Sequence, residues 1–194
     1  MKRLMAAVSV LFFALPAYAE VESFVIDQRH TYPSFEVSHM GLSTQRGRFD
    51  STSGRITLDR AAKTGTVEIT IDARTVSTGL DELEKHLRNE DFFNVDKYPT
   101  ITFKSNAVEF ENDVPKSIVG DLTLLGVTRP VTLAVSSFNC RVHPINKKYV
   151  CGADAATTIK RSDFGMTYAI PGVSDEVKLL LQVEAFKEGQ QTQP

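Results

Sequence analysis

The fold of this chain is decided by two neighbouring stretches, His86-Leu-Arg-Asn-Glu-Asp-Phe-Phe-Asn-Val-Asp-Lys-Tyr-Pro99 and Ile101-Thr-Phe-Lys-Ser105. The first completes a segment of helical periodicity, and its final proline returns the chain to an extended conformation. In the second, apolar and polar residues alternate, which is the period of a strand with one buried face. The sequence therefore predicts a short helix followed closely by a β-strand.

The same period of two residues recurs along most of the chain. Val67, Ile69 and Ile71, for example, alternate with polar residues. At least eight segments of this kind in one domain imply a sandwich or a closed barrel. We expect strands over residues 35–39, 56–58, 67–71, 101–104, 118–125, 131–135, 153–159 and 177–185, with breaks at Gly41, Gly54, Gly65, Asn112-Asp113 and Gly126.

One segment, Leu80–Asn89, departs from this alternation. Leu83 and Leu87 follow Leu80 at helical spacing, so the three share one face. Thr78 and Asp81 form a plausible capping pair at the start. We expect a single short helix here, acting as a lid or plug at one end of the barrel.

The first 19 residues have the features of an export signal. Lys2 and Arg3 precede an apolar segment over residues 4–15, and Ala17-Tyr-Ala19 fits a cleavage site. The mature chain is therefore expected to begin at Glu20, in the periplasm. The apolar segment is too short to span a bilayer, and no later segment is long and apolar enough, so we expect no stable membrane insertion.

The rest of the chain fits one domain over residues 20–186, followed by a polar, flexible tail over residues 187–194. Without the signal, 20 basic residues face 24 acidic ones, a net charge of −4. This balance argues against a nucleic-acid partner and against electrostatic attraction to an anionic membrane. The sequence leaves open whether the chain forms a homodimer.

The chain has two cysteines, Cys140 and Cys151, with a turn-bearing stretch between them. Export favours a disulfide, which would clamp the two arms of a hairpin. The chain-entropy model gives such a short loop about 2–3 kcal/mol of stabilisation. The alternative is a metal or redox pair, but the spacing is not CxxC and His143 alone completes no ligand set.

No catalytic or metal-binding signature is present. The four histidines do not stand at HxH or HExxH spacing, and no serine lies in a G-x-S-x-G turn. We therefore assign no catalytic residue and no metal ligand.

Five polar residues are candidates for ligand contact or for the barrel rim. His86 and Arg88 could meet a headgroup at a cavity mouth, or they could pin the helix to the barrel rim. His39 either touches a ligand or forms hydrogen bonds at the barrel end. Arg161 and Asp163 lie two residues apart, so both could belong to the rim.

The order and spacing of these pieces resemble the YceI-like family of periplasmic lipid-binding proteins. The resemblance covers nearly the whole mature chain and is carried by Phe24-Val-Ile-Asp27, Phe35-Glu-Val-Ser-His39, His86 to Phe93, Gly120 to Pro130 and Arg161-Ser-Asp-Phe-Gly165. It implies an all-β fold, an extended eight-stranded antiparallel lipocalin-like barrel with a long apolar interior. It also implies a bound polyisoprenoid, isoprenoid quinone or fatty-acid-derived lipid, with no other cofactor and no established catalysis.

Slim side chains pointing into such a barrel leave a tunnel for one slender ligand. The predicted ligand-binding residues are Phe35, Val37, His39, Phe49, Val67, Ile69, Ile71, His86, Arg88, Phe92, Phe93, Phe103, Leu122 and Arg161.

Three hypotheses of function follow. The first is a non-catalytic periplasmic carrier for a long apolar lipid. The second is an enzyme acting on an apolar substrate in the same cavity, with His39, His86, Arg161 and Asp163 as its polar groups. The third is a barrel filled by its own side chains that binds a partner protein.

Overall fold

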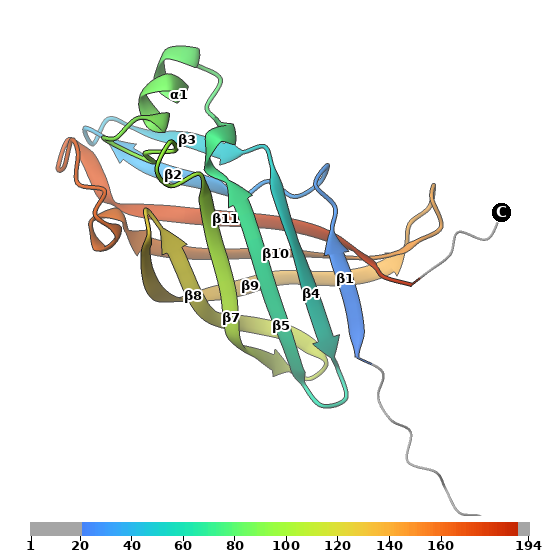
Figure 1. Ribbon diagram of the computed structural model, residues 1–194. Helices are drawn as coiled ribbons and strands as arrows, with labels where there is room; N and C mark the ends of the chain where they lie inside the picture. The colour runs from blue at the N-terminus through green and yellow to red at the C-terminus, as the bar shows by residue number, and fades with distance from the viewer. Residues whose placement is uncertain (1–20, 190–194) are drawn as a thin grey trace, which may run out of the picture.

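The computed structural model describes residues 21–189, which form a strongly curved antiparallel β-structure with one α-helix (Figure 1). The predicted export signal and residues 190–194 of the predicted tail lie outside the described residues. The strands are β1 (Glu22–Ile26), β2 (Ser34–His39), β3 (Ser43–Phe49), β4 (Thr52–Asp59), β5 (Thr64–Asp72), β6 (Val76–Ser77), β7 (Thr100–Glu111), β8 (Val114–Leu124), β9 (Val127–Val142), β10 (Tyr149–Lys160) and β11 (Val173–Lys187).

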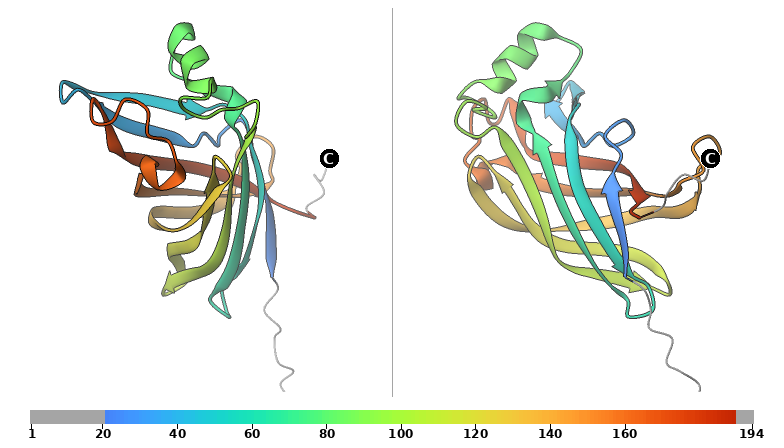
Figure 2. Two further views of the ribbon diagram at one scale, coloured as in Figure 1. Left: turned by 60° about the vertical axis from the view of Figure 1, so that its left-hand side comes forward. Right: turned by 45° about the vertical axis from the view of Figure 1, so that its right-hand side comes forward.

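Eight of these strands close into a barrel, in the order β1-β4-β5-β7-β8-β9-β10-β11, with β1 pairing again with β11. Closure depends on the length of β11, which has two partners along one edge. Ala185 near its end pairs with Ile26 of β1, whereas Val177 and Leu180 pair with β2. Strands β2, β3 and β6 extend the wall beyond the ring (Figure 2). The prediction of an eight-stranded antiparallel barrel is confirmed.

Seven of the eight predicted strand segments lie within strands, and the segment 118–125 runs one residue past β8 into the turn at Leu125. Two of the predicted breaks are wrong. Gly54 lies inside β4 and Gly65 inside β5. A Cβ atom at Gly54 would lie 2.3 Å from the carbonyl oxygen of Glu68 on the paired strand. Glycine is thus needed at this position for close backbone approach rather than for a turn. Gly41 and Gly126 do lie in turns and have positive φ angles.

The helix α1 (Asp81–Arg88) forms where it was expected and stands over one end of the barrel (Figures 1 and 2). Its start is not held by the predicted Thr78–Asp81 pair. Instead, the carboxylate of Glu84 accepts hydrogen bonds from the backbone N–H of Thr78 at 2.7 Å and of Gly79 at 3.1 Å. These bonds hold the pKa of Glu84 below its usual value, and the bond from Thr78 has the largest effect. No helix in residues 21–189 is long and apolar enough to cross a membrane.

Two clusters of buried side chains lie at different heights in the barrel. The larger cluster lies under α1 and includes Phe49, Leu87 and Phe164. The smaller one closes the far end and consists of Phe24, Ile26, Leu58, Cys151 and Ala185. The predicted disulfide between Cys140 and Cys151 is confirmed, and it joins directly paired residues of β9 and β10.

Candidate binding cavity

The barrel encloses a cavity of about 450 Å³ between α1 and the smaller buried cluster. Alternate residues of each strand point inward, so the two-residue period of β5 places Val67, Ile69 and Ile71 on its wall. Most of the wall is made of Val, Ile, Leu and Phe side chains contributed by nearly every strand of the barrel. Such a space suits a long, unbranched or lightly branched apolar molecule.

Twelve of the fourteen predicted ligand-binding residues line this cavity. They are Phe35, Val37, His39, Phe49, Val67, Ile69, Ile71, Phe92, Phe93, Phe103, Leu122 and Arg161.

His86 and Arg88 do not line the cavity, although both were predicted as ligand contacts. The Nε2 atom of His86 lies 3.1 Å from a carboxylate oxygen of Asp91. Arg88 donates to the carbonyl oxygen of Val76 at 3.4 Å and lies 3.9 Å from Glu84. Both side chains therefore fasten α1 to its surroundings, which is the second role considered for them. Their contact with a ligand headgroup stays a prediction.

Arg161 reaches the cavity wall from a short 3₁₀ helix, η2 (Arg161–Phe164), and is almost completely buried. Its guanidinium group donates to three backbone carbonyls, those of Ser174 and Val173 at 2.9 Å and that of Met166 at 3.2 Å. Burial lowers the pKa of this group, and the nearby carboxylate of Asp175 partly offsets the effect. The side chain fixes the loop that joins η2 to β11, and Asp163, its predicted companion on the rim, is exposed.

A group of aromatic rings covers the cavity below α1. Phe93 packs against Phe35 and Phe49, with ring centroids 6.2 Å and 5.3 Å away. Phe92 turns to the rim, where it meets the rings of His86 and Tyr168 at 5.0 Å and 5.4 Å. The consecutive phenylalanines therefore have different neighbours, the rings of Phe35 and Phe49 for Phe93 and those of His86 and Tyr168 for Phe92.

The sequence prediction missed a large part of the wall. Val135 of β9 and Leu179 and Leu181 of β11 line the cavity from the side opposite β5. Their alternation was visible in the sequence and could have identified them. Two buried threonines, Thr31 and Thr52, also line the cavity, and no sequence pattern pointed to them.

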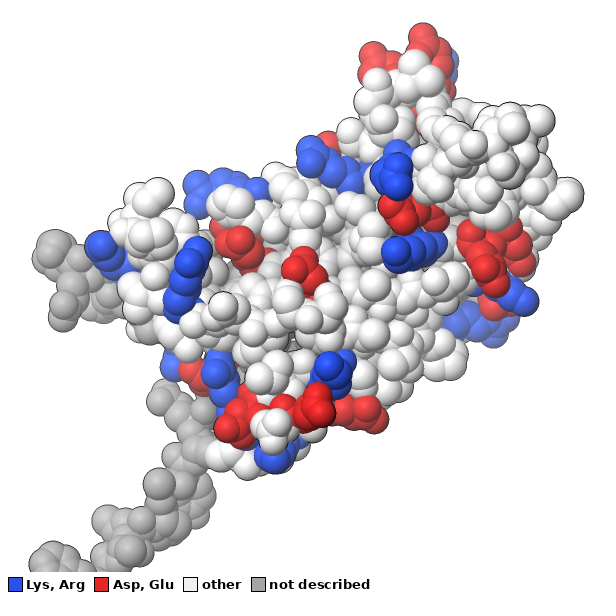
Figure 3. Space-filling model, turned by 180° about the vertical axis from the view of Figure 1, so that it is seen from behind, with Lys and Arg blue, Asp and Glu red and all other residues white. Residues whose placement is uncertain are grey.

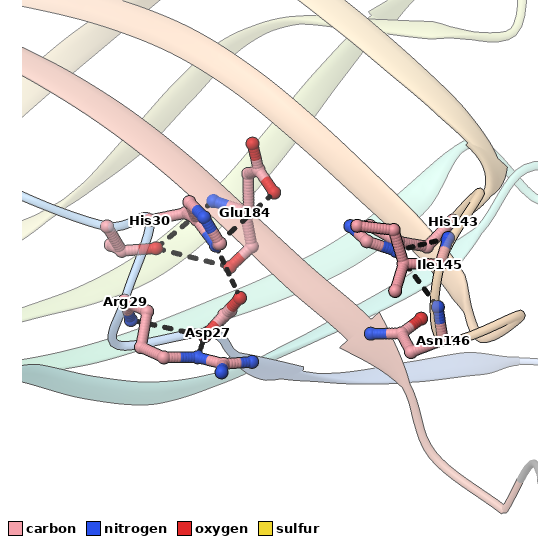
Figure 4. A network of polar contacts seen from close by, with 8 residues as sticks. Asp27, Arg29, His30, His143, Ile145, Asn146 and Glu184 are labelled. Carbon is pink, nitrogen blue, oxygen red and sulfur yellow. Dashed lines mark hydrogen bonds and ion pairs between the residues drawn. The ribbon is translucent and has the colours of Figure 1, made fainter.

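A separate polar group lies where the connection between β1 and β2 meets β11 (Figure 4). His30 Nδ1 lies 2.7 Å from one carboxylate oxygen of Asp27 and 3.9 Å from a carboxylate oxygen of Glu184. The backbone N–H of Arg29 donates to the other oxygen of Asp27 at 3.1 Å. Burial raises the pKa of Asp27, but the bonds and charges of His30 and Arg29 outweigh it, so this pKa is lowered.

Asp27, His30 and Glu184 are the one group of metal-ligating side chains found within residues 21–189. The sequence search missed it because Glu184 is remote in sequence and joins the group only when the barrel closes. The hydrogen bonds already satisfy Asp27, and the guanidinium of Arg29 lies 3.6 Å from it. The arrangement therefore holds the β1–β2 connection against β11, where the barrel closes.

The fold and the cavity together define a class of protein, the closed eight-stranded barrel with an apolar interior cavity. A family model described as "YceI-like domain" matches residues 24–185, and the chain belongs to this family.

Similar proteins agree with this membership. A UPF0312 protein of Pseudomonas aeruginosa is 36% identical over 192 residues, which cover 97% of this chain and all of that protein. The crystal structure of Burkholderia cenocepacia BcnA is 23% identical with a TM-score of 0.69, over 82% of this chain and 98% of that one. A Saccharophagus degradans structure, titled a polyisoprenoid binding domain, is 17% identical with a TM-score of 0.59, over 87% and 99%. These two structures show a shared fold.

Proposed function

We propose that this protein is a periplasmic carrier that holds a long apolar lipid inside its barrel without changing it chemically. The observation that carries the proposal is the cavity of about 450 Å³ inside the barrel, with its almost wholly apolar wall. Burial of apolar surface supplies affinity at roughly 25 cal/mol per Å² before the costs of binding are subtracted. A polyisoprenoid, an isoprenoid quinone or a fatty-acid-derived chain has the required shape and polarity.

One comparison supports the lipid class through a shared fold. The Saccharophagus degradans structure is titled a polyisoprenoid binding domain, and it shares this fold at low sequence identity. The periplasmic location is supported by the export signal that the sequence predicts over residues 1–19. The intact mass of protein recovered from the periplasmic fraction tests the location, because cleavage before Glu20 gives one defined value.

Carriage is favoured over catalysis because the polar candidates for an enzyme do not converge. Arg161 uses its donors on backbone carbonyls, and His86 is engaged outside the cavity wall. Asp163 is exposed, which leaves His39 at the cavity end without these partners. The hypothesis of a barrel filled by its own side chains is also disfavoured, because the interior holds a cavity.

The deciding experiment is mass spectrometry of a solvent extract of the protein, purified from the periplasm without detergent. A single lipid species in about stoichiometric amount would support the proposal and identify the cargo. An extract without lipid, both before and after incubation with a polyprenol, a ubiquinone and a long-chain fatty acid, would overturn it.

A further inference from the structure

Two loops at one end of the barrel contain no Lys, Arg, Asp or Glu. Residues 37–45, which include the turn between β2 and β3, form the first uncharged run. Residues 164–174, between η2 and β11, form the second. Charged residues make up 24% of the whole chain, yet neither of these runs, of nine and eleven residues, contains one.

The two runs are joined in space and present apolar side chains to solvent. The backbone N–H of Met40 donates to the carbonyl oxygen of Gly172 at 2.6 Å, so the loops lie side by side. Met40 is 66% exposed and Leu42 is 81% exposed. Large parts of two further apolar side chains on the second loop are also exposed. We call the set the apolar tip, and it consists of Met40, Leu42, Tyr168 and Ile170.

The apolar tip stands beside the cavity. Residues from the same two runs, His39, Gln45, Met166 and Val173, belong to the cavity wall. The ribbon views show the β2–β3 turn and the loop before β11 together at the end covered by α1 (Figures 1 and 2). A ligand that leaves the cavity at this end therefore passes close to the tip.

Two connections elsewhere on the barrel do contain charged residues. The turn between β4 and β5 contains Arg60 and Lys63, and the connection between β9 and β10 contains Lys147 and Lys148. From behind, charged groups are spread over the barrel, whereas the end beside α1 that carries the two loops shows a continuous white area (Figure 3). The two uncharged loops at the cavity end therefore differ from these two connections.

We propose that the apolar tip docks the protein on a lipid bilayer, with the cavity end facing the acyl chains. The inference rests on the proposed carriage of a lipid, since a long apolar chain passes between bilayer and cavity at the lowest cost when it avoids water. Four exposed apolar side chains in uncharged loops suit shallow insertion at the interface. The occupant of the surface is a bilayer because it is the phase from which such a cargo comes.

The chain contains no tryptophan, so one introduced indole reports on one position. Leu42→Trp labels the tip, and Ile145→Trp is its control, because Leu42 and Ile145 are 81% and 84% exposed and lie in loops at opposite ends. Each variant is mixed with phosphatidylcholine vesicles that carry bromine atoms on the acyl chains. We expect quenching and a blue shift for Leu42→Trp and no change for Ile145→Trp. Quenching at neither position, or equally at both, would overturn the proposal.

A second pair of variants measures the strength of docking. Leu42→Asp should lower the partition coefficient of the protein between vesicles and water about 10-fold, since it removes a large apolar group and adds a charge at the interface. Ile145→Asp should leave it unchanged, and circular dichroism checks that both variants are folded. If Leu42→Asp instead abolishes a dimer seen by analytical ultracentrifugation, while vesicles bind neither protein, the tip is a contact between two copies and the proposal fails.

The two proposals can fail separately. Quenching by vesicles reports docking whatever the cavity contains, and solvent extraction reports cargo whatever the tip does. Lipid in the extract with no vesicle quenching would overturn docking alone. If vesicles quench the indole but the extract contains no lipid, the proposed carrier function is overturned. The proposal that lipid passes between the bilayer and the cavity at the tip then fails with it.

Discussion

The ring of Phe93 stands edge-on to the ring of Phe49, with their centroids 5.3 Å apart and their planes at 77°. The contact joins the segment after α1 to β3, two parts of the chain that are over 40 residues apart. Edge-to-face pairs of this kind add about 0.5–1.5 kcal/mol beyond the area they bury. Because both rings line the cavity, the contact fastens α1 over the cavity as well as stabilising the barrel.

Phe93→Ala should loosen this end of the barrel. We expect the free energy of unfolding to fall by about 2–4 kcal/mol, because a partly buried ring is lost. We also expect a bound fluorescent lipid to dissociate faster than from the unchanged protein. Phe186→Ala is the control, since that ring packs with His143 and does not line the cavity. Equal dissociation rates for Phe93→Ala and the unchanged protein would argue against a role of this contact in retention.

Ile69→Trp should block the cavity while leaving a folded barrel. Ile69 lies on the cavity wall, and a larger side chain there occupies space that the lipid would need. We expect lipid in the solvent extract to fall by at least about 10-fold, since overlap with a rigid wall excludes the chain. Thr70→Trp is matched to it, because Thr70 is the next residue of β5 and points outward. Unchanged lipid content in Ile69→Trp would mean that the cargo binds elsewhere.

Much of the barrel could be predicted because its signals are local. The alternation around Ile69 and Phe103 determines both the strand and the inward face, and leucine spacing determines α1. The closure of the ring is not local, because β1 has only five residues and is defined by pairing with β4 and β11. Gly54 was assigned to a turn because the close approach of Glu68 is a tertiary contact.

The polar part of the candidate site was the harder one to predict. His86 and Arg88 were selected for their charge, but their nearest partners come from the loop after α1 and from β6. Arg161 was expected at the rim, yet its three acceptors belong to a loop whose path could not be read from sequence. The hydrogen-bond acceptors of such side chains come from segments that only the folded structure brings close. Their role therefore depends on contacts that sequence periodicity does not reveal.

The contact between the Asp27 carboxylate and His30 should make the free energy of unfolding depend on pH. The folded-state pKa of Asp27 lies below its ordinary value of 3.8, so the ionised carboxylate contributes stability above that value. This contribution is lost as the pH falls through the lower, folded-state pKa. We expect Asp27→Asn to be about 1–3 kcal/mol less stable than the unchanged protein at pH 7, and the difference to shrink below about pH 4.

Urea unfolding at pH 7 and pH 3 measures this difference for Asp27→Asn. Asp50→Asn is the control, because Asp50 pairs with Arg48 at the surface and exposed pairs contribute little. A stability difference for Asp27→Asn that is the same at both pH values would contradict the proposed linkage.

Two buried threonines on the cavity wall should respond in opposite directions to loss of a hydroxyl group. The hydroxyl of Thr52 has no hydrogen-bond partner among the described residues, whereas that of Thr31 donates to the backbone carbonyl of Glu184 at 3.2 Å. We expect Thr52→Val to stabilise the lipid-free protein by about 1 kcal/mol and Thr31→Val to destabilise it by about 1–3 kcal/mol. Thermal unfolding of both variants, freed of lipid, measures the effects. Destabilisation by Thr52→Val would show that its hydroxyl is satisfied in the folded protein.

Arg161 should act as a structural anchor rather than as a ligand contact. Its planar group reaches the carbonyls of Val173 and Ser174 on one side and of Met166 on the other. A lysine at this position keeps the charge but lacks the fork that reaches three acceptors. We expect Arg161→Lys to lower the free energy of unfolding by about 2–4 kcal/mol, since buried carbonyls lose their donors. Limited proteolysis should then cut the loop between η2 and β11 first.

The control for this change is Arg129→Lys. Arg129 is exposed and donates one hydrogen bond, at 3.1 Å, to the carbonyl of Asp163 on η2. Its replacement should cost under about 1 kcal/mol, because water can take the place of the lost bond. If Arg161→Lys were as stable as Arg129→Lys but bound lipid more weakly, Arg161 would contact the cargo directly. If both stability and proteolysis change as expected, its contribution to binding runs through the loop that it holds.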